Sequence, residues 1–143
     1  MTTSTASAVW EGKLKDGSGS FRADSGAFKG EYSFATRFEG AKGSTPEELL
    51  AAAHAACFSM ALSLGLEKAG TPSESISTTA HCTIGQAGGG FAITKMRLET
   101  RGRVPGIDDA AFKRAAKDAV EGCPVSGALK NNLAIELDAA LEG

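Results

Sequence analysis

Closely spaced cysteines, runs of charge of one sign and an apolar leader are all missing from this sequence. The three cysteines, Cys57, Cys82 and Cys123, lie far apart, which excludes the cysteine framework of a small secreted domain. Basic residues are scattered and the net charge is only −2, so we expect neither nucleic acid nor a membrane as a partner. The start, MTTSTASAVW, has no basic end and no apolar stretch, so we expect no secretory signal and a reducing, cytoplasmic setting.

The residues that are present have the balance of a soluble globular protein, with 42% apolar and 22% charged residues. A length of 143 residues suits one hydrophobic core, and no linker or low-complexity tract divides the chain. We therefore predict a single domain over residues 1–143.

The first part of the chain predicts three strands. Asp16-Gly17 is a typical hairpin turn between residues 7–15 and 19–24. In residues 30–38 the alternation predicts a third strand, with Arg37 on one face. The opposite face would carry Tyr32, Phe34, Thr36 and Phe38.

A long helix is expected next, from Thr45 as N-cap to about residue 69, with Gly70 as the stop. Pro46 at its first position and Glu48 closing a capping box support this start. Between residues 49 and 66 the helix has almost no polar face, which is typical of a helix buried on all sides. It is long enough to cross a membrane, but its alanine content, its histidine and the lack of flanking basic residues argue against a span. We expect a partner subunit to cover the apolar helix surface that a single chain cannot bury.

The remaining elements are two strands, a helix, a short helical turn and a last strand. They are expected at residues 73–85, 91–101, 108–121, 124–130 and 133–139. The second helix would bury Phe112, Ala115, Ala116, Ala119 and Val120. The order β-β-β-α-β-β-α-β, with mostly hairpin connections, predicts an α+β fold with helices on an antiparallel sheet.

The two cysteines outside the strands lie in different surroundings. Cys123 follows the helix-ending Gly122 and precedes Pro124, so its sulfur should lie near free backbone N–H groups that lower a thiol pKa. Cys57 lies inside the long helix and needs a cation from elsewhere in the fold. Arg22, Arg37 and the arginines near residue 100 are all candidates. A buried cysteine and one at a helix terminus suit a peroxidatic and resolving pair.

Three residues have simpler interpretations. Cys82 shares a strand face with Ile76 and Ile84, so we expect it to fill core volume, whereas His81 points the other way. His54 could complete a metal site with Cys57 and Cys123, but no closely spaced ligand pair supports one.

Three stretches resemble the osmotically inducible protein C (OsmC) family, sister to the organic hydroperoxide resistance proteins. They are YSFATRFEGAKGSTPEELLAAAHAACFSMALSLGLEKAG (32–70), GFAITKMRLETRGRVPGID (90–108) and GCPVSGALK (122–130). The resemblance covers nearly the whole chain. It implies an intertwined homodimer and a thiol peroxidase that reduces organic hydroperoxides in stress defence, with no metal, flavin or nucleotide.

The same resemblance implies roles for four residues. Carried over by motif, Cys57 of AACFSMAL is the peroxidatic cysteine and Cys123 of GCPVS is the resolving one. Arg37 of TRFEG and Glu47 of PEEL complete the site. The reductant implied is a dithiol, either a lipoyl group or a thioredoxin-type donor. Because Glu47 and Cys57 lie ten residues apart on one helix, about 15 Å along its axis, we expect Glu47 to act on the partner subunit's site.

Two other functions remain open from the residues alone. One is a cysteine-dependent hydrolase that uses Cys57 with His54 as base, although nothing in the sequence builds an oxyanion hole. The other is a non-catalytic protein that binds an apolar ligand and whose cysteines only pack.

Overall fold

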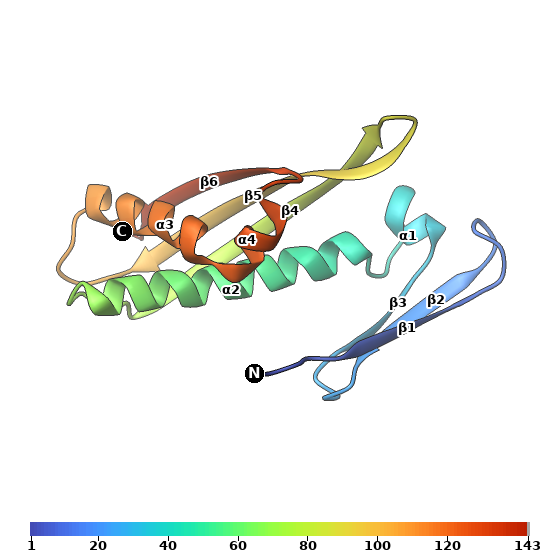
Figure 1. Ribbon diagram of the computed structural model, residues 1–143, viewed down its shortest axis with the longest axis horizontal. Helices are drawn as coiled ribbons and strands as arrows, with labels where there is room; N and C mark the ends of the chain where they lie inside the picture. The colour runs from blue at the N-terminus through green and yellow to red at the C-terminus, as the bar shows by residue number, and fades with distance from the viewer. Residues whose placement is uncertain (143) are drawn as a thin grey trace. The chain divides into compact units, whose positions relative to one another are not determined.

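The structure, a computed structural model, describes residues 1–142 (Figure 1). The chain forms two compact units, Met1–Leu49 and Leu50–Gly143. Each unit contains one three-stranded sheet, so the predicted α+β class is confirmed but the strands form two sheets instead of one.

The sheet of the first unit has the order β1-β2-β3 and is antiparallel throughout. Its strands are β1 (Ala6–Glu11), β2 (Ser18–Ala23) and β3 (Lys29–Tyr32). The predicted first hairpin is confirmed, because Glu11 pairs with Ser18 across the turn.

The third strand ends earlier than the alternation predicts, and the expected strand over residues 33–38 is wrong. Residues Phe34–Phe38 form a short helix, α1. Ser33 caps it reciprocally with Thr36: the Thr36 N–H donates to Ser33 Oγ at 3.1 Å, and the Ser33 N–H donates to Thr36 Oγ1 at 2.9 Å. Phe34 and Phe38 are then neighbours on one helix face, with ring centroids 5.0 Å apart. Apolar residues at this spacing fit a helix as well as a strand, so the local cap decides.

The long helix is confirmed as α2, Pro46–Lys68. Thr45 Oγ1 accepts a hydrogen bond from the Glu48 N–H at 3.0 Å, as expected of an N-cap, whereas the Glu48 carboxylate accepts from Ser44 Oγ at 2.7 Å. At the other end Gly70 has φ +83°, and bonds from Gly70 N–H to Glu67 and from Thr71 N–H to Leu66 close the helix.

The second unit carries the sheet β4-β5-β6, with strands Ser75–Ala87, Gly90–Arg103 and Ala134–Leu141. β4 and β5 form the expected hairpin, but β5 and β6 are parallel, so the prediction of a wholly antiparallel sheet is wrong here. Between them the chain passes through α3 (Asp109–Gly122) and α4 (Pro124–Leu129), and such a crossover returns it in the same direction. In Figure 1 α2, α3 and α4 lie along one face of this sheet.

The core of the second unit lies between that sheet and its helices. α2 contributes Phe58, Leu62 and Leu66, and β5 contributes Met96 and Leu98. α3 contributes Phe112, Ala116 and Ala119, whereas Ala115 and Val120 are only partly buried.

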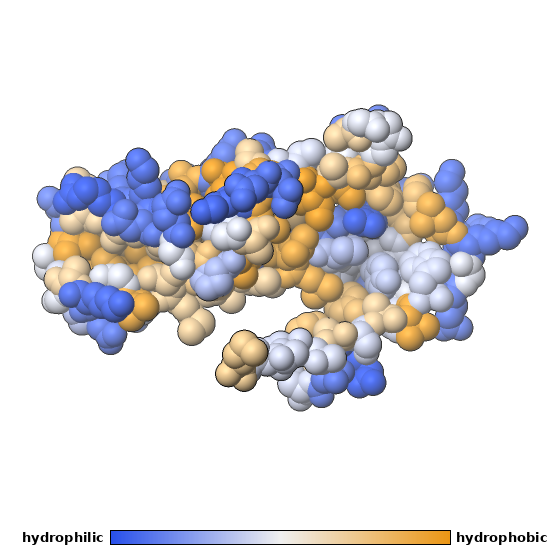
Figure 2. Space-filling view, viewed as in Figure 1, coloured by the Kyte–Doolittle hydropathy of each residue, from blue (hydrophilic) through white to orange (hydrophobic). Residues whose placement is uncertain are grey.

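The single chain buries only one side of α2. Met60 and Leu64 on this helix are 76% and 50% exposed, so the expected burial on all sides is not reached within one chain. Apolar residues accordingly reach the surface around the middle of the second unit (Figure 2). By length and composition α2 could also cross a bilayer. Core helices meet the same criterion, and the buried Phe58, Leu62 and Leu66 identify α2 as a core helix.

Candidate functional site

Two thiols meet in the second unit. Cys57 lies in α2 and Cys123 lies between α3 and α4, and the two thiols are close enough that each acts on the pKa of the other. Cys123 is almost fully buried, whereas Cys57 is half-buried. Both are free thiols in this structure. The fold therefore brings together the two cysteines that the resemblance pairs.

The position of Cys123 follows from the junction of two helices. Its N–H donates to the Ala119 carbonyl at 2.9 Å and ends α3, and Pro124 then begins α4. Burial opposes ionisation of Cys123. It is outweighed by the backbone N–H of Ser126, the Cys57 thiol, the Ser126 hydroxyl and the Val125 N–H, so the pKa of Cys123 is lowered. This agrees with the expectation of free N–H groups at this terminus.

Cys57 has the opposite character. Burial raises the pKa of its thiol, the neighbouring Cys123 raises it further, and the Val125 N–H opposes the shift only in part. In the part of the chain that the structure describes, no cation is among the groups that set this pKa. That Cys57 receives a cation from elsewhere in the fold stays a prediction.

Arg37 and Glu47 form a second pair, in the first unit. Arg37 Nε donates to Glu47 Oε1 and Arg37 Nη2 donates to Glu47 Oε2, both at 2.9 Å. Glu47 is only 5% exposed, whereas the Arg37 side chain is 33% exposed. The Phe38 ring lies 5.5 Å from the guanidinium carbon and covers it further. A two-point contact of this kind holds a guanidinium in one orientation while leaving part of it accessible.

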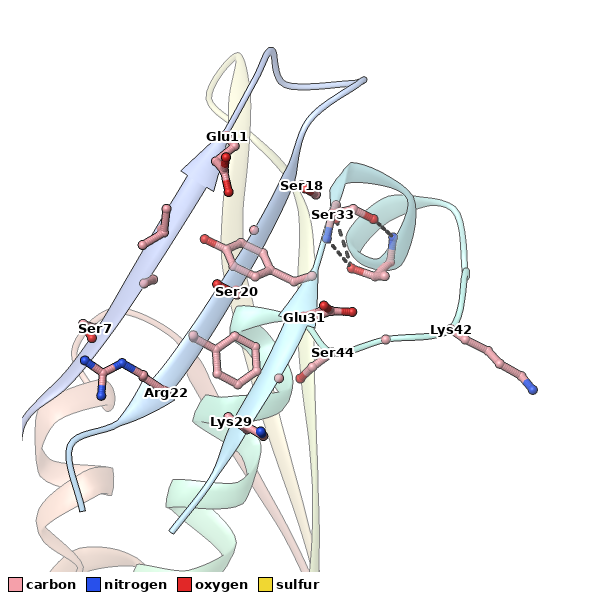
Figure 3. A pocket seen from close by; sticks show the side chains of 18 residues that line it. Ser7, Glu11, Ser18, Ser20, Arg22, Lys29, Glu31, Ser33, Lys42 and Ser44 are labelled. Atoms are coloured by element: carbon pink, nitrogen blue, oxygen red, sulfur yellow. Dashed lines mark hydrogen bonds between the residues drawn. The ribbon is translucent and has the colours of Figure 1, made fainter. Parts of the chain in front are cut away.

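The other candidate arginines have different surroundings. Arg97 and Arg101 form ion pairs with Asp138, and Arg103 pairs with Glu142. Arg22 lies in β2 and lines an open hollow over the first sheet, together with serines of β1, of β2 and of the nearby loops. Figure 3 shows these side chains, among them Ser7, Ser18, Ser20 and Ser44. None of the four predicted site residues lines this hollow.

His54 is fully buried and its Nε2 lies 2.7 Å from Ser126 Oγ. It therefore pairs with a residue beside Cys123, and it is not among the groups that act on Cys57. Burial lowers the pKa of His54, so the ring is neutral near pH 7. Sequence reasoning missed Ser126, although the GCPVS motif that contains it was already singled out.

The remaining sequence candidates have structural surroundings. Cys82 is half-buried and packs against the core from β4, as expected. His81 is exposed on the opposite face, where its Nε2 lies 3.1 Å from Glu99 Oε1. Within residues 1–142 no group of three or more His, Cys, Asp or Glu side chains is placed to hold a metal ion.

Comparison with known proteins places this geometry in context. Residues 39–138 match the family described as OsmC-like protein. The chain is 49% identical over 130 residues to Peroxiredoxin OsmC of Escherichia coli (strain K12), covering 90% of this chain and 91% of the relative. It is 37% identical over 103 residues to the organic hydroperoxide resistance protein of Xanthomonas axonopodis pv. citri (strain 306), covering 71% and 70%.

A solved structure agrees with these relatives. The crystal structure of an organic hydroperoxide resistance protein from Elizabethkingia anophelis superposes with a TM-score of 0.79 at 28% identity, and the match covers 99% of each chain. The fold of the whole chain is thus one that this group of proteins shares.

Proposed function

The chain belongs to the OsmC-like protein family, and from that premise we propose that it reduces organic hydroperoxides to alcohols, with Cys57 as the attacking thiol and Cys123 as the resolving thiol. It is a cysteine-based peroxidase, as its relatives are named. The observation that carries the assignment is that the two thiols are neighbours, each acting on the pKa of the other.

The reaction has two steps in this proposal. The Cys57 thiolate attacks the distal oxygen of R–O–O–H and expels R–O⁻, which takes a proton to give the alcohol, and Cys57 becomes a sulfenic acid. The Cys123 thiolate then attacks the Cys57 sulfur and displaces hydroxide, which takes a proton to give water. The product is a Cys57–Cys123 disulfide, and an external dithiol reduces it.

Arg37 supplies the positive charge that Cys57 lacks in its own unit. A guanidinium beside the thiolate lowers the thiol pKa and stabilises the charge that develops on the leaving alkoxide. Glu47 fixes the direction of Arg37 through the two 2.9 Å contacts. Because Glu47 is nearly buried, little water competes for these two contacts.

We assign Arg37 and Glu47 to the site of the partner subunit in a homodimer. Ten residues of α2 separate Glu47 from Cys57, about 15 Å along the helix axis, and a glutamate side chain cannot span that length. The exposed Met60 and Leu64 on α2 support a dimer, since an isolated chain would leave them in water. An antiparallel packing of two α2 helices across a two-fold axis would cover these side chains.

The site favours substrates and partners of particular kinds. The half-buried Cys57 has apolar neighbours along α2, among them Phe58 and Met60, which suit an alkyl hydroperoxide better than hydrogen peroxide. The reductant we propose is a dithiol of the lipoyl or thioredoxin type. With its peroxidase relatives, the protein is proposed to act in the cytoplasm in stress defence.

The other two functions gain less support. A hydrolase with His54 as base needs a contact between His54 and Cys57, whereas the imidazole pairs with Ser126. A binding protein with inert thiols gives no reason for Cys57 and Cys123 to lie close enough to act on each other's pKa.

Steady-state consumption of cumene hydroperoxide with dithiothreitol tests the proposal. Cys57→Ser should abolish turnover, and Cys123→Ser should keep one rapid turnover and accumulate a sulfenic acid that dimedone traps. Cys82→Ser is the control and should change turnover by no more than about twofold, because it removes only a packing contact. Full turnover by Cys57→Ser, or dimedone labelling of Cys123, would reverse the roles.

A further inference from the structure

A buried chain of hydrogen bonds leads from α2 to the resolving cysteine. His54 Nε2 lies 2.7 Å from Ser126 Oγ, and the Ser126 hydroxyl is in turn one of the neighbouring groups that lower the pKa of the Cys123 thiol. His54 and Ser126 are 0% and 1% exposed, so water does not compete for these contacts. Neither residue belongs to the four-residue site described above.

The unpartnered nitrogen of His54 indicates in which direction the hydrogen bonds of this series are donated. Nδ1 is buried and has no hydrogen-bond partner among the described residues. A buried N–H without an acceptor is rarer in folded proteins than a bare lone pair, which favours the tautomer with its proton on Nε2. His54 then donates to Ser126 Oγ. The single hydroxyl proton of Ser126 is then free to donate to sulfur. Both donors, His54 Nε2–H and the Ser126 hydroxyl, are therefore directed towards Cys123.

Burial favours a neutral imidazole, so His54 and Ser126 act on Cys123 through the dipoles of their hydrogen bonds and not through a full charge. Polarisation along a chain strengthens each bond, so the His54 donor makes the Ser126 hydroxyl a better donor to sulfur. Such bonds are stronger to a thiolate than to a thiol.

We propose that His54 and Ser126 prepare Cys123 for the resolving step: Ser126 stabilises its thiolate by direct contact, and His54 is the positioning residue that holds Ser126. The inference rests on the proposed role of Cys123. In the step concerned, the Cys123 thiolate forms the S–S bond as the S–O bond of the Cys57 sulfenic acid breaks. The hydroxide released takes a proton to become water, so no further reactant is needed.

The first test titrates the Cys123 thiolate by its ultraviolet absorbance in the Cys57→Ser protein, which needs no peroxide. Ser126→Ala should raise the pKa of Cys123 by about one unit, because one hydrogen bond to a charged group is lost. His54→Leu should raise the pKa of Cys123 by a smaller amount. His54→Gln should leave that pKa close to its value in the Cys57→Ser protein, because the glutamine amide nitrogen can occupy the position of Nε2 and donate to Ser126.

Ser59→Ala is the matched control. It removes a part-buried hydroxyl from the same helix, bonded to Thr78 at 2.8 Å, and should leave the Cys123 titration unchanged. If the melting temperature shows that His54→Leu does not fold, the Cys123 titration of Ser126→Ala, which is a smaller change, still tests the proposal. An unmoved titration in Ser126→Ala, or an equal shift in Ser59→Ala, overturns the proposal while leaving the peroxidase assignment intact.

The second test is the pH dependence of the resolving rate, followed by stopped flow after a single equivalent of cumene hydroperoxide. Below the thiol pKa, Ser126→Ala should form the disulfide about three times more slowly, because the loss of thiolate exceeds the gain in nucleophilicity. Above the pKa it should be about three times faster, because the less stabilised thiolate is the better nucleophile. A purely structural role would slow the reaction equally at every pH, and parallel profiles would refute the inference. Peroxide consumption by Cys57→Ser would refute the proposed function instead.

Discussion

At the scale of residues, the acidity of two neighbouring thiols decides the chemistry. Backbone N–H groups and the Ser126 hydroxyl lower the pKa of Cys123 against the effect of burial, whereas burial raises the pKa of Cys57. In the proposed mechanism the attacking thiol Cys57 therefore depends on a charge supplied by Arg37, and the resolving thiol Cys123 depends on neutral donors. Two different sources of stabilisation allow the two sulfurs to be altered separately.

Substitution of Arg37 should act on Cys57. In a Cys123→Ser background, Arg37→Ala should raise the pKa of Cys57 by about 1–3 units, since an adjacent opposite charge is lost. Arg37→Lys should restore only part of the rate of peroxide reduction, because an ammonium cannot make the two-point contact to Glu47. The pH dependence of the rate of alkylation by iodoacetamide measures the pKa of Cys57 in each variant, and consumption of cumene hydroperoxide measures the rate of reduction.

Arg22→Ala is the comparison for this test, because Arg22 is the other candidate in the first unit. It should leave the Cys57 titration where it is. A shift in Arg22→Ala with none in Arg37→Ala would transfer the role to Arg22.

The buried His54 should make the folded state sensitive to mild acid. Burial lowers the pKa of His54 below its unfolded value of about 6.5, so the unfolded chain binds the proton more readily. The stability from the neutral ring is complete above about pH 6.5 and is lost as the pH falls through the lower folded value. Melting temperatures between pH 7.5 and 5 should therefore fall more steeply for the wild type than for His54→Gln. His81→Gln, which alters an exposed ring, should keep the steep wild-type slope.

At the scale of elements, local signals predicted more than distant pairings did. The limits of α2 were predictable because Thr45, Pro46 and Gly70 act within one turn of the helix ends. The β4–β5 hairpin was predictable because Gly88 and Gly89 lie between two alternating stretches, and both adopt positive φ.

Other elements depend on information that a local pattern lacks. α1 was mistaken for a strand because Phe34 and Phe38 satisfy both periodicities, and only the Ser33–Thr36 cap distinguishes them. The parallel pairing of β6 depends on how α3 and α4 return the chain to the sheet. The contact of His54 with Ser126 joins residues far apart in the chain, so no spacing could indicate it.

A glycine in β5 allows α3 to approach the sheet closely. A Cβ placed on Gly102 would lie 2.5 Å from Cε1 of Phe112, and that ring is fully buried. Gly102→Ala should lower the free energy of unfolding by about 1–3 kcal/mol, because the ring cannot move without disturbing the core. Urea unfolding measures this effect. Gly85→Ala in β4, where a Cβ meets nothing within 4 Å, should stay within about 0.5 kcal/mol of the wild type. Equal losses in the two variants would mean that the backbone, and not the Phe112 contact, is responsible.

At the scale of the whole molecule, the α2 helix carries one residue of each proposed pair, Glu47 and Cys57. Its length separates Glu47 from Cys57 of the same chain, and its exposed Met60 and Leu64 call for a covering surface. The homodimer proposed above, in which each subunit supplies Arg37 and Glu47 to the other, would meet both requirements.

Mixed dimers test that arrangement. Glu47→Ala and Cys57→Ser subunits, each inactive alone, should give a heterodimer with one intact site and one doubly altered site. Activity should return on mixing to about half the wild-type value per dimer, because only one of the two symmetric sites is complete. If heterodimers form and no activity returns, Glu47 serves its own subunit or none.

Mass spectrometry of the non-reduced protein after one equivalent of cumene hydroperoxide tests the central claim most directly. The account predicts a monomer mass lower by two hydrogens and a single linked peptide pair containing Cys57 and Cys123, whose thiols are already neighbours in the structure. Cys82 should remain reduced. A disulfide through Cys82, a covalent link between subunits, or an oxidised Cys123 beside an unreacted Cys57 would contradict the assignment of the two thiols.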